Sequence, residues 1–216
     1  LYLLEDRGRV IGRIAAFYDH LAQEFWREKV GHFGYFECVE DPEAGRLLLE
    51  TAREWLKQEG CTAMRGPWSF VSQEWGSVVE GFTPSPVIMG PYNPPYYNKL
   101  YSNYGLKKVK DLLCWEISVE KGYQVPERIL SLTEAIQRRY DIHIRSLDMK
   151  HYDEEVKIII ELANSTIISN WGYSPVTDAE VRAMAHDLRP VLQPKGVLFA
   201  EDNTGKPIGF AITLPD

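Results

Sequence analysis

Hydrophobic and polar residues alternate along three early stretches of the chain, and such alternation predicts β-strands. Two strands are expected within LYLLEDRGRVIGRIAAFYD, separated by a turn at 6–8, and a third within HFGYFECVE. Helical spacing of apolar residues then begins after Asp41 and Pro42 and stops at Gly60, which predicts a helix over 42–59. TAMRGP predicts a further short strand, so these elements together predict a mixed sheet with a helix packed on it.

The stretch NPPYYNKLYSNYGL predicts a second helix, over 94–104, after an irregular region rich in glycine, proline and aromatic residues. Asn93 is suited to cap its N-terminus and Gly105 to end it. The spacing i, i+3, i+4 and i+7 places one stripe of side chains toward the interior. That stripe consists of Tyr97, Leu100, Tyr101 and Tyr104. The apolar residues of LLCWEI, at 112–117, predict a largely buried strand after this helix.

The remainder of the chain repeats a pattern of strands and helices. A linker helix is expected over 126–139. It is followed by a strand in DIHIRSLD, helices in DEEVKIIIELANSTI and TDAEVRAMAHDLRP, and two strands on either side of DNTGK. The patterns divide the chain into 1–118, a linker at 119–140, and 141–216.

Composition narrows the class of protein. The 216 residues are 44% hydrophobic and 25% charged, with a net charge of -7, which argues against nucleic acid or an anionic membrane as the main partner. No apolar run approaches the roughly 20 residues of a membrane span. Three cysteines without a short spacing, and five histidines without a metal-binding pair, predict neither disulfides nor a metal site. We expect a cytoplasmic protein.

The order of elements resembles the GNAT superfamily of acyl-CoA N-acyltransferases. The carrying stretches are NKLYSNYGLKKVKDLLCWEI, GRIAAFYD, PIGFAITL and LLLETAREWLKQEG, and the wider run resembles mostly uncharacterised bacterial tandem-GNAT proteins. The resemblance implies an α/β (α+β mixed sheet) GNAT-like fold. Residues 1–118 would be one unit lacking its first strand and helices, and 141–216 the N-terminal half of a second unit.

The resemblance also implies an activity, the transfer of an acyl group from acetyl-CoA or another acyl-CoA to the amine of a small molecule or peptide. Tyr101, four residues before Gly105, matches the tyrosine that protonates the leaving sulfur in the family. Glu37, on the strand face of Tyr35 and Val39, is the best candidate for the base that deprotonates the amine. The alternatives are packing on the buried stripe for Tyr101 and pairing with an arginine for Glu37.

The cofactor turn departs from the family. In VEDPEAGRLL, Gly45 and Arg46 match the end of the family's Q/R-x-x-G-x-G/A motif, and Asn93 lies where a residue often contacts the cofactor. Helix capping also explains Asn93. Three carboxylates, Glu40, Asp41 and Glu43, lie where the diphosphate would bind, so we expect weak or absent coenzyme A binding at 40–46. The alternative function is a non-catalytic GNAT-like binding or interaction module with a degenerate coenzyme A site.

Two expectations concern partners. We expect an amine acceptor to bind between 20–31 and the 68–92 loop. The strands at 196–202 and 206–214 lack the strand that follows them in the family, and an open sheet edge favours association. We expect that edge to be covered by the first unit, by a second copy of the chain in a homo-oligomer, or by residues outside this sequence.

Overall fold

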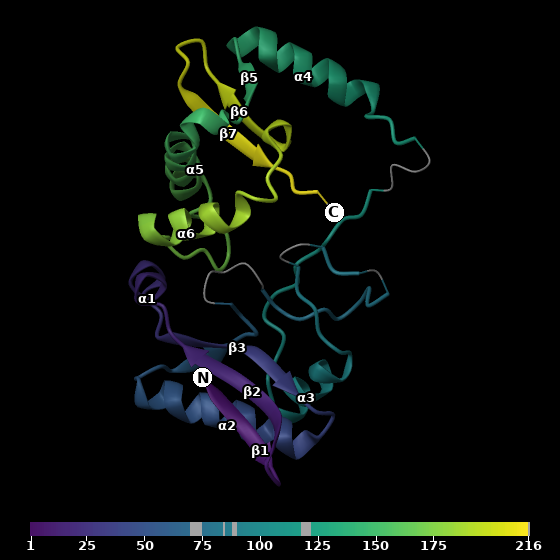
Figure 1. The fold of residues 1–216 in the computed structure, drawn as a ribbon, viewed down its shortest axis with the longest axis vertical. Coiled ribbons are helices and arrows are strands. Elements are labelled where there is room, and N and C mark those ends of the chain that lie inside the picture. Colours follow the sequence, from purple (N-terminus) through teal and green to yellow (C-terminus); the bar gives the residue numbers. More distant parts are fainter. Residues whose placement is uncertain (70–74, 84, 88–89, 118–121, 216) are drawn as a thin grey trace. The chain divides into compact units, whose positions relative to one another are not determined.

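The computed structural model describes residues 1–69, 75–83, 85–87, 90–117 and 122–215. The chain divides into two compact units, Leu1–Leu112 (unit 1) and Leu113–Asp216 (unit 2). Each unit combines helices with one open β-sheet (Figure 1). The expected mixed α/β class is therefore confirmed, and each unit is described below by itself.

Unit 1 contains a four-stranded sheet in the order β1-β2-β3-β4. The first three strands are antiparallel, and β4 joins β3 in parallel, as expected for a mixed sheet. The elements are β1 (Tyr2–Asp6), β2 (Arg9–Phe17), α1 (His20–Trp26), β3 (Val30–Cys38), α2 (Pro42–Gln58), β4 (Ala63–Arg65) and α3 (Tyr96–Tyr104).

The core of unit 1 lies between this sheet and the helices α2 and α3. Strand residues Ile14 and Phe33 are buried against Leu49 of α2, and these three side chains are almost inaccessible to solvent. The sheet and α2 approach closely because β2 and β3 carry glycine at the contacts. A Cβ on Gly31 would lie 2.3 Å from Leu56 Cδ2, so any other residue there requires the Leu56 side chain to move.

A β-bulge interrupts the pairing of β2 and β3. Ala15 pairs with Gly34 and Arg13 with Glu37, so two residues of β3 oppose one of β2. Tyr35 supplies the bulge, with a positive φ of 48°. On its far side Phe36 is buried and Glu37 exposed, which confirms the faces that the alternation predicted.

Unit 2 contains an antiparallel sheet in the order β5-β6-β7, covered on one face by α5 and α6. Its core includes Val156 and Ile160 of α5 and Val197 and Phe199 of β6. The elements are α4 (Glu127–Tyr140), β5 (His143–Ser146), η1 (Met149–His151), α5 (Tyr152–Thr166), α6 (Asp178–Leu188), η2 (Pro194–Gly196), β6 (Val197–Glu201) and β7 (Pro207–Ile212).

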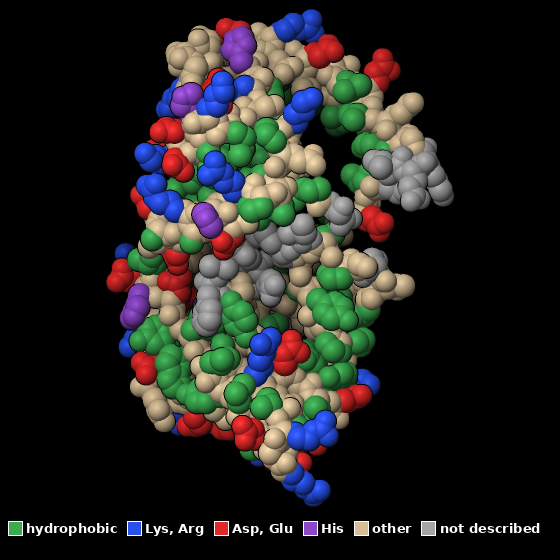
Figure 2. Space-filling view, viewed as in Figure 1, with side chains coloured by type: hydrophobic (Ala, Val, Ile, Leu, Met, Phe, Trp, Pro, Cys, Tyr) green, Lys and Arg blue, Asp and Glu red, His purple; other side chains and the backbone are tan. Residues whose placement is uncertain are grey.

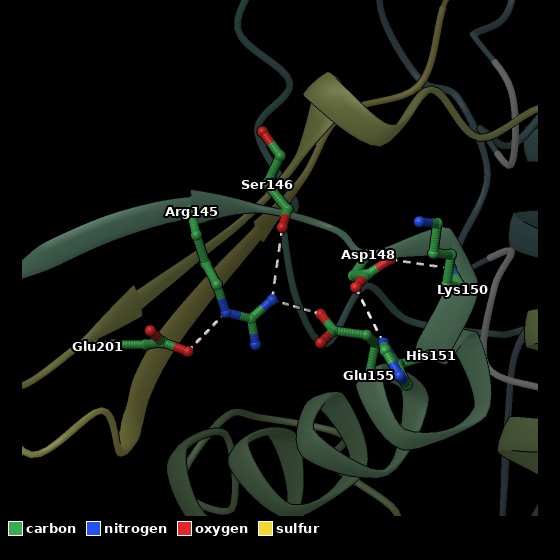
Figure 3. Close-up of polar contacts among 7 residues, drawn as sticks. All are labelled: Arg145, Ser146, Asp148, Lys150, His151, Glu155 and Glu201. Atoms are coloured by element: carbon green, nitrogen blue, oxygen red, sulfur yellow. Dashed lines mark hydrogen bonds and ion pairs between the residues drawn. The ribbon is translucent and has the colours of Figure 1, made fainter.

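A buried ion pair connects the elements of unit 2 (Figure 3). Arg145 of β5 donates from Nη1 to Glu155 of α5 at 2.6 Å and from Nε to Glu201 of β6 at 2.5 Å. Glu155 is only 6% exposed, so its carboxylate needs this guanidinium. Asp148 and His151, 2.9 Å apart, form a separate exposed pair at the start of α5. The Arg145 guanidinium therefore joins β5, α5 and β6, and both of its pairing carboxylates belong to the chain itself.

The structure adds one helix and corrects one local expectation. The 20–31 stretch, to which the sequence analysis assigned no helix or strand, contains α1, which begins after Asp19 because the Asp19 side chain accepts from the Ala22 amide at 3.1 Å. Asn93 does not cap α3, whose N-cap is Pro95 without a side-chain bond. The Asn93 side chain is directed to another part of the chain.

The prediction of a buried strand at 112–117 is wrong. These residues form no strand, and Leu113 and Trp115 are 75% and 85% exposed. A strand needs ladder partners as well as an apolar pattern, and no described strand of either unit pairs with this segment. The element order predicted for unit 1 is therefore confirmed as far as α3, apart from the additional helix α1.

We predict that Gly34→Ala destabilises unit 1 by about 2 kcal/mol or more. A Cβ at this position would lie 1.7 Å from the Trp68 carbonyl oxygen, so the backbone must move. Urea denaturation followed by hydrogen exchange of the β2 and β3 amides measures the effect. Gly209→Ala in β7 is the control, because its Cβ would meet nothing closer than 4.0 Å. An unchanged midpoint for Gly34→Ala would contradict the close approach.

Candidate active site

The candidate site lies at the end of β3, where this strand runs past β4. Pairing with β4 is limited to Val30–His32, and one further bond joins the Trp68 amide to the Phe33 carbonyl at 2.9 Å. The Val39 amide donates to the carbonyl oxygen of Ile11, a residue of β2, at 3.0 Å. Because successive backbone groups of a strand point in opposite directions, the amide and carbonyl of Cys38 point away from β2.

Two tyrosines of α3 satisfy these backbone groups. The Tyr97 hydroxyl accepts from the Cys38 amide at 3.0 Å, and the Tyr96 hydroxyl donates to the Cys38 carbonyl at 2.7 Å. Tyr97 also donates to Glu37 Oε2 at 2.7 Å. The tyrosine hydroxyls therefore take the place of a neighbouring strand, and the same contact orients the carboxylate of Glu37.

The surroundings of Glu37 have features of both of its expected roles, the catalytic base and the partner of an arginine. Its side chain is 60% exposed, so an incoming amine can reach it, and Tyr97 restricts its orientation. Arg13, its partner in the strand register, lies 3.8 Å from the other carboxylate oxygen, as the arginine-paired alternative predicts. An exposed pair at that distance is weak. The role of base is compatible with this geometry and stays a prediction.

Tyr101 lies deeper in the same region. Its ring packs on Phe33, Phe36 and Tyr97 at centroid distances of 5.6, 5.2 and 6.4 Å, and the residue is 9% exposed. Its hydroxyl makes no hydrogen bond within the described part of the chain. Burial raises the pKa of Tyr101, with smaller contributions from Tyr97 and Glu37. Tyr101 is thus a weaker acid than a free phenol, and its role as proton donor stays a prediction.

The turn at 40–46 offers few amide donors to a diphosphate. Asp41 Oδ1 accepts from the amides of Glu43 and Ala44 at 2.7 and 3.1 Å, and the Asp41 carbonyl accepts from Gly45 at 3.0 Å. Pro42 has no amide hydrogen. The first turn of α2 is therefore satisfied by the chain's own aspartate, which occupies the place that an anion would take.

The three residues expected to contact the cofactor all have other partners. Arg46 makes a two-point contact with Glu43 at 2.7 and 2.8 Å, which lowers the pKa of the Glu43 carboxyl. A Cβ on Gly45 would lie 3.2 Å from Leu100, so this glycine lets α3 pack on α2. Asn93 is 6% exposed and bonded elsewhere. Residues 40–46 do not fit the pyrophosphate of coenzyme A, and no described contact joins Asn93 to them.

Asn93 instead holds the segment that precedes α3. Its Oδ1 accepts from the Val78 amide at 2.7 Å, and its Nδ2 donates to the Val78 carbonyl at 3.3 Å. Asn98 adds a second bond to the Val78 carbonyl, at 2.8 Å, and its Oδ1 accepts from the Ser77 hydroxyl at 2.6 Å. These two amides attach the segment around Val78 to α3, and thereby to the end of β3.

Sequence reasoning missed two features of this region. Tyr97 was assigned to packing, because its partner Glu37 is 60 residues away and no local spacing reveals the contact. The second is a group of stacked rings on β2, β3 and the chain after β4. Alternation around Phe33 places His32 on the opposite face of β3, and this was the one available signal. We call the group the aromatic cluster; it consists of Phe17, His32, Trp68 and Trp75.

Two further classes of site have no support in the part of the chain that the structure describes. It contains no group of three histidine, cysteine, aspartate or glutamate side chains placed to hold a metal ion. Its helices are also too short or too polar to cross a membrane. Hydrophobic side chains are nevertheless exposed over much of unit 1 in the view of Figure 2.

Comparison with known proteins finds two curated relatives, whereas no protein-family model and no solved structure matches the chain. "Protein YghO" of Escherichia coli (strain K12) is 29% identical over 216 residues, covering 100% of this chain and 54% of that protein. The "Bacterial ceramide synthase" of Caulobacter vibrioides is 31% identical over 224 residues, covering 100% of this chain and 56% of that protein. The chain is thus a distant homologue of both along all of its residues, and it spans about half the length of each relative.

Tyr97→Phe is predicted to destabilise unit 1 by about 1 to 3 kcal/mol, because it leaves the buried Cys38 amide without a partner. Tyr101→Phe is the matched control on the same helix, and we expect a change below about 0.5 kcal/mol because its hydroxyl makes no described bond. Urea denaturation of both variants measures the difference. Equal losses would show that the hydroxyl of Tyr97 does not support the end of β3.

We predict that Arg46→Glu leaves the affinity for acetyl-CoA, measured by isothermal titration, within about twofold of the parent protein. Arg46 is already paired, and a phosphate placed 4 Å from one of the nearby carboxylates would meet a repulsion of about 4 kcal/mol at an effective dielectric constant near 20. Arg53→Glu, which removes a similarly paired arginine of α2, is the control. Low-micromolar binding that only Arg46→Glu abolishes would establish 40–46 as a working cofactor turn.

Proposed function

We propose that this chain is part of an N-acyltransferase that transfers an acyl group from a thioester, such as an acyl-CoA, to the amine of a long-chain amino alcohol. The observation that carries the proposal is the homology, along all 216 residues, to a protein named bacterial ceramide synthase. A ceramide is the amide of a fatty acid and a long-chain amino alcohol, so its synthesis joins an acyl group to an amine. The element order of unit 1 supports the same assignment through its resemblance to GNAT enzymes.

The reaction makes two demands on the protein. The amine nitrogen attacks the thioester carbonyl, a C–N bond forms, the C–S bond breaks, and one proton passes from the amine to the departing sulfur overall. A base must accept the amine proton and an acid must supply one to the sulfur. In our proposal Glu37 is the base, held by Tyr97, and Tyr101 is the proton donor.

The two roles differ in their support. Glu37 is exposed and oriented, as a residue that meets an incoming substrate needs to be. Tyr101 is buried, and its raised pKa makes proton donation less favourable than from a free phenol. We therefore expect the larger contribution from Glu37.

The second candidate is a GNAT-like module that binds a partner without catalysing acyl transfer. The contacts at the start of α2 favour it, because Asp41 occupies the amides and Glu43 occupies Arg46. If the protein is catalytic, its donor is held through the acyl chain or the rest of the thioester, and residues 40–46 do not bind the diphosphate.

The test is amide formation by the purified protein from a series of acyl-CoAs and 2-amino-octadecane-1,3-diol, followed by mass spectrometry and by release of free thiol. We predict that Glu37→Gln lowers kcat by about a hundredfold and Tyr101→Phe by about tenfold. Glu5→Gln, an exposed glutamate of β1 in the same sheet, is the control and stays at the parent rate. Absence of product with every acyl-CoA would favour the binding module, and full activity of Glu37→Gln would exclude Glu37 as the base.

A further inference from the structure

The aromatic cluster lies on the part of the sheet where β2, β3 and the chain after β4 meet. His32 pairs with Phe17 in the strand register, and their rings stack at 5.7 Å. Trp68 lies 4.9 Å from His32 and stacks on Trp75 at 4.8 Å with an angle of 17°. The cluster is thus a row of aromatic rings in contact, made of one phenyl ring, one imidazole and two indoles.

Two buried nitrogen atoms of this cluster have no hydrogen-bond partner. They are Nδ1 of His32, a residue 7% exposed, and Nε1 of the half-buried Trp75. No other buried side-chain nitrogen or oxygen atom in the described residues lacks a hydrogen-bond partner. An unsatisfied buried group costs about 1 to 3 kcal/mol, and native proteins satisfy most of them. Both atoms lie in this one cluster, which makes it the candidate site for a polar group from outside the chain.

The imidazole of His32 is neutral at physiological pH. Burial, together with the nearby positive charge of Arg65, lowers its pKa to about 4, and Asp19 has a smaller opposing effect. A neutral imidazole has one donor and one acceptor nitrogen, and which of them is Nδ1 depends on the tautomer. The indole of Trp75 can only donate.

A hydroxyl group meets these requirements better than a charged group. It donates and accepts, so it bonds to Nδ1 in either tautomer and accepts from an indole. A carboxylate would lose its hydration with little compensation, because Arg65 already pairs with Glu28 at 3.5 Å. Trp68 is buried between His32 and Trp75, whereas Trp75 is half-buried, so the exposed part of the Trp75 ring suits an apolar chain attached to the hydroxyl carbon.

We propose that the aromatic cluster is a binding site for a hydroxyl group carried on an apolar chain, with the hydroxyl at Nδ1 of His32 and the chain along the half-buried Trp75. The site is reached from the side of Trp75, which is only half-buried. Trp75 lies three residues before Val78, the residue that Asn93 and Asn98 hold in place. The proposal does not rest on acyl transfer, and it holds equally for a catalytic and a non-catalytic protein.

The test uses the whole chain with ¹⁵N-labelled histidine and tryptophan, titrated with 1-hexanol and with 1-methoxyhexane, which lacks the hydroxyl hydrogen. We expect 1-hexanol to shift the Nδ1 resonance of His32 and the indole resonance of Trp75 along a saturating curve. The ether is expected to bind at least tenfold more weakly. Equal shifts with both probes, or no saturable shift with 1-hexanol, would overturn the proposal and leave the two nitrogens as sites of water or of packing only.

His32→Phe keeps the stacked rings and removes both nitrogens. We expect this variant to remain folded, with a Tm equal to or above that of the parent, and to lose the preference for 1-hexanol over the ether. A preference that survives in the folded variant would contradict the assignment to His32. His20→Phe, at the exposed start of α1, is the control and keeps the preference.

A second arm distinguishes two sources of the hydroxyl. If 2-amino-octane-1,3-diol binds at least tenfold more tightly than 1-hexanol, the site receives the head of the amine acceptor. If the two bind equally, the site takes a simple alcohol that is unrelated to the acyl transfer. Either result supports a hydroxyl site, and the amide-forming assay remains a separate measurement of the proposed function.

Discussion

The arrangement of unit 1 depends on how the free end of β3 is satisfied. A strand that outruns its neighbour exposes an amide and a carbonyl, and leaving them unpaired in a partly buried place is costly. Here the hydroxyls of Tyr96 and Tyr97 bond to both groups of Cys38. This contact fixes α3 against the sheet and directs the Tyr97 hydroxyl to Glu37. Through Asn93 and Asn98, the same helix also holds the segment that leads from Trp75.

The end of β3 and the start of α2 differ in the chemistry that they allow. At the end of β3 a carboxylate is exposed and oriented, which suits a reaction at an amine. At the start of α2 the amides and Arg46 are already occupied by Asp41 and Glu43. In the acyl transfer that we propose, the nucleotide part of the donor is therefore not held by this turn.

The regular elements could be predicted from the sequence because they follow from local periodicity. Alternation placed Phe36 inside and Glu37 outside, and the 3.6-residue period placed Tyr97 and Tyr101 in the core. Contacts between distant segments could not be predicted in this way. Asn93 has the residue type of a helix cap, yet Val78, 15 residues earlier, takes its side chain.

The segment at 112–117 shows a second limit of prediction from sequence, because here a local pattern predicted an element that does not form. Its apolar residues have the composition of a buried strand, but they are exposed because no described strand lies beside them to complete a ladder. Composition shows which segments are able to form a strand, but a strand forms only where a neighbouring strand pairs with it. The mixed α/β class and the crowding of carboxylates at 40–46 were therefore predictable, whereas the two unpaired nitrogens of the aromatic cluster and the contact of Tyr97 with Glu37 needed the three-dimensional arrangement.

Hydrogen–deuterium exchange with a non-reactive thioether analogue of a long-chain acyl-CoA tests the central claim most directly, because it reports where the donor contacts the chain. Our account predicts slower exchange at Phe36 to Cys38 and in the first turn of α3, with no change at 40–46. Protection that is confined to 40–46, or to unit 2, would contradict it and would place the acyl donor away from the end of β3.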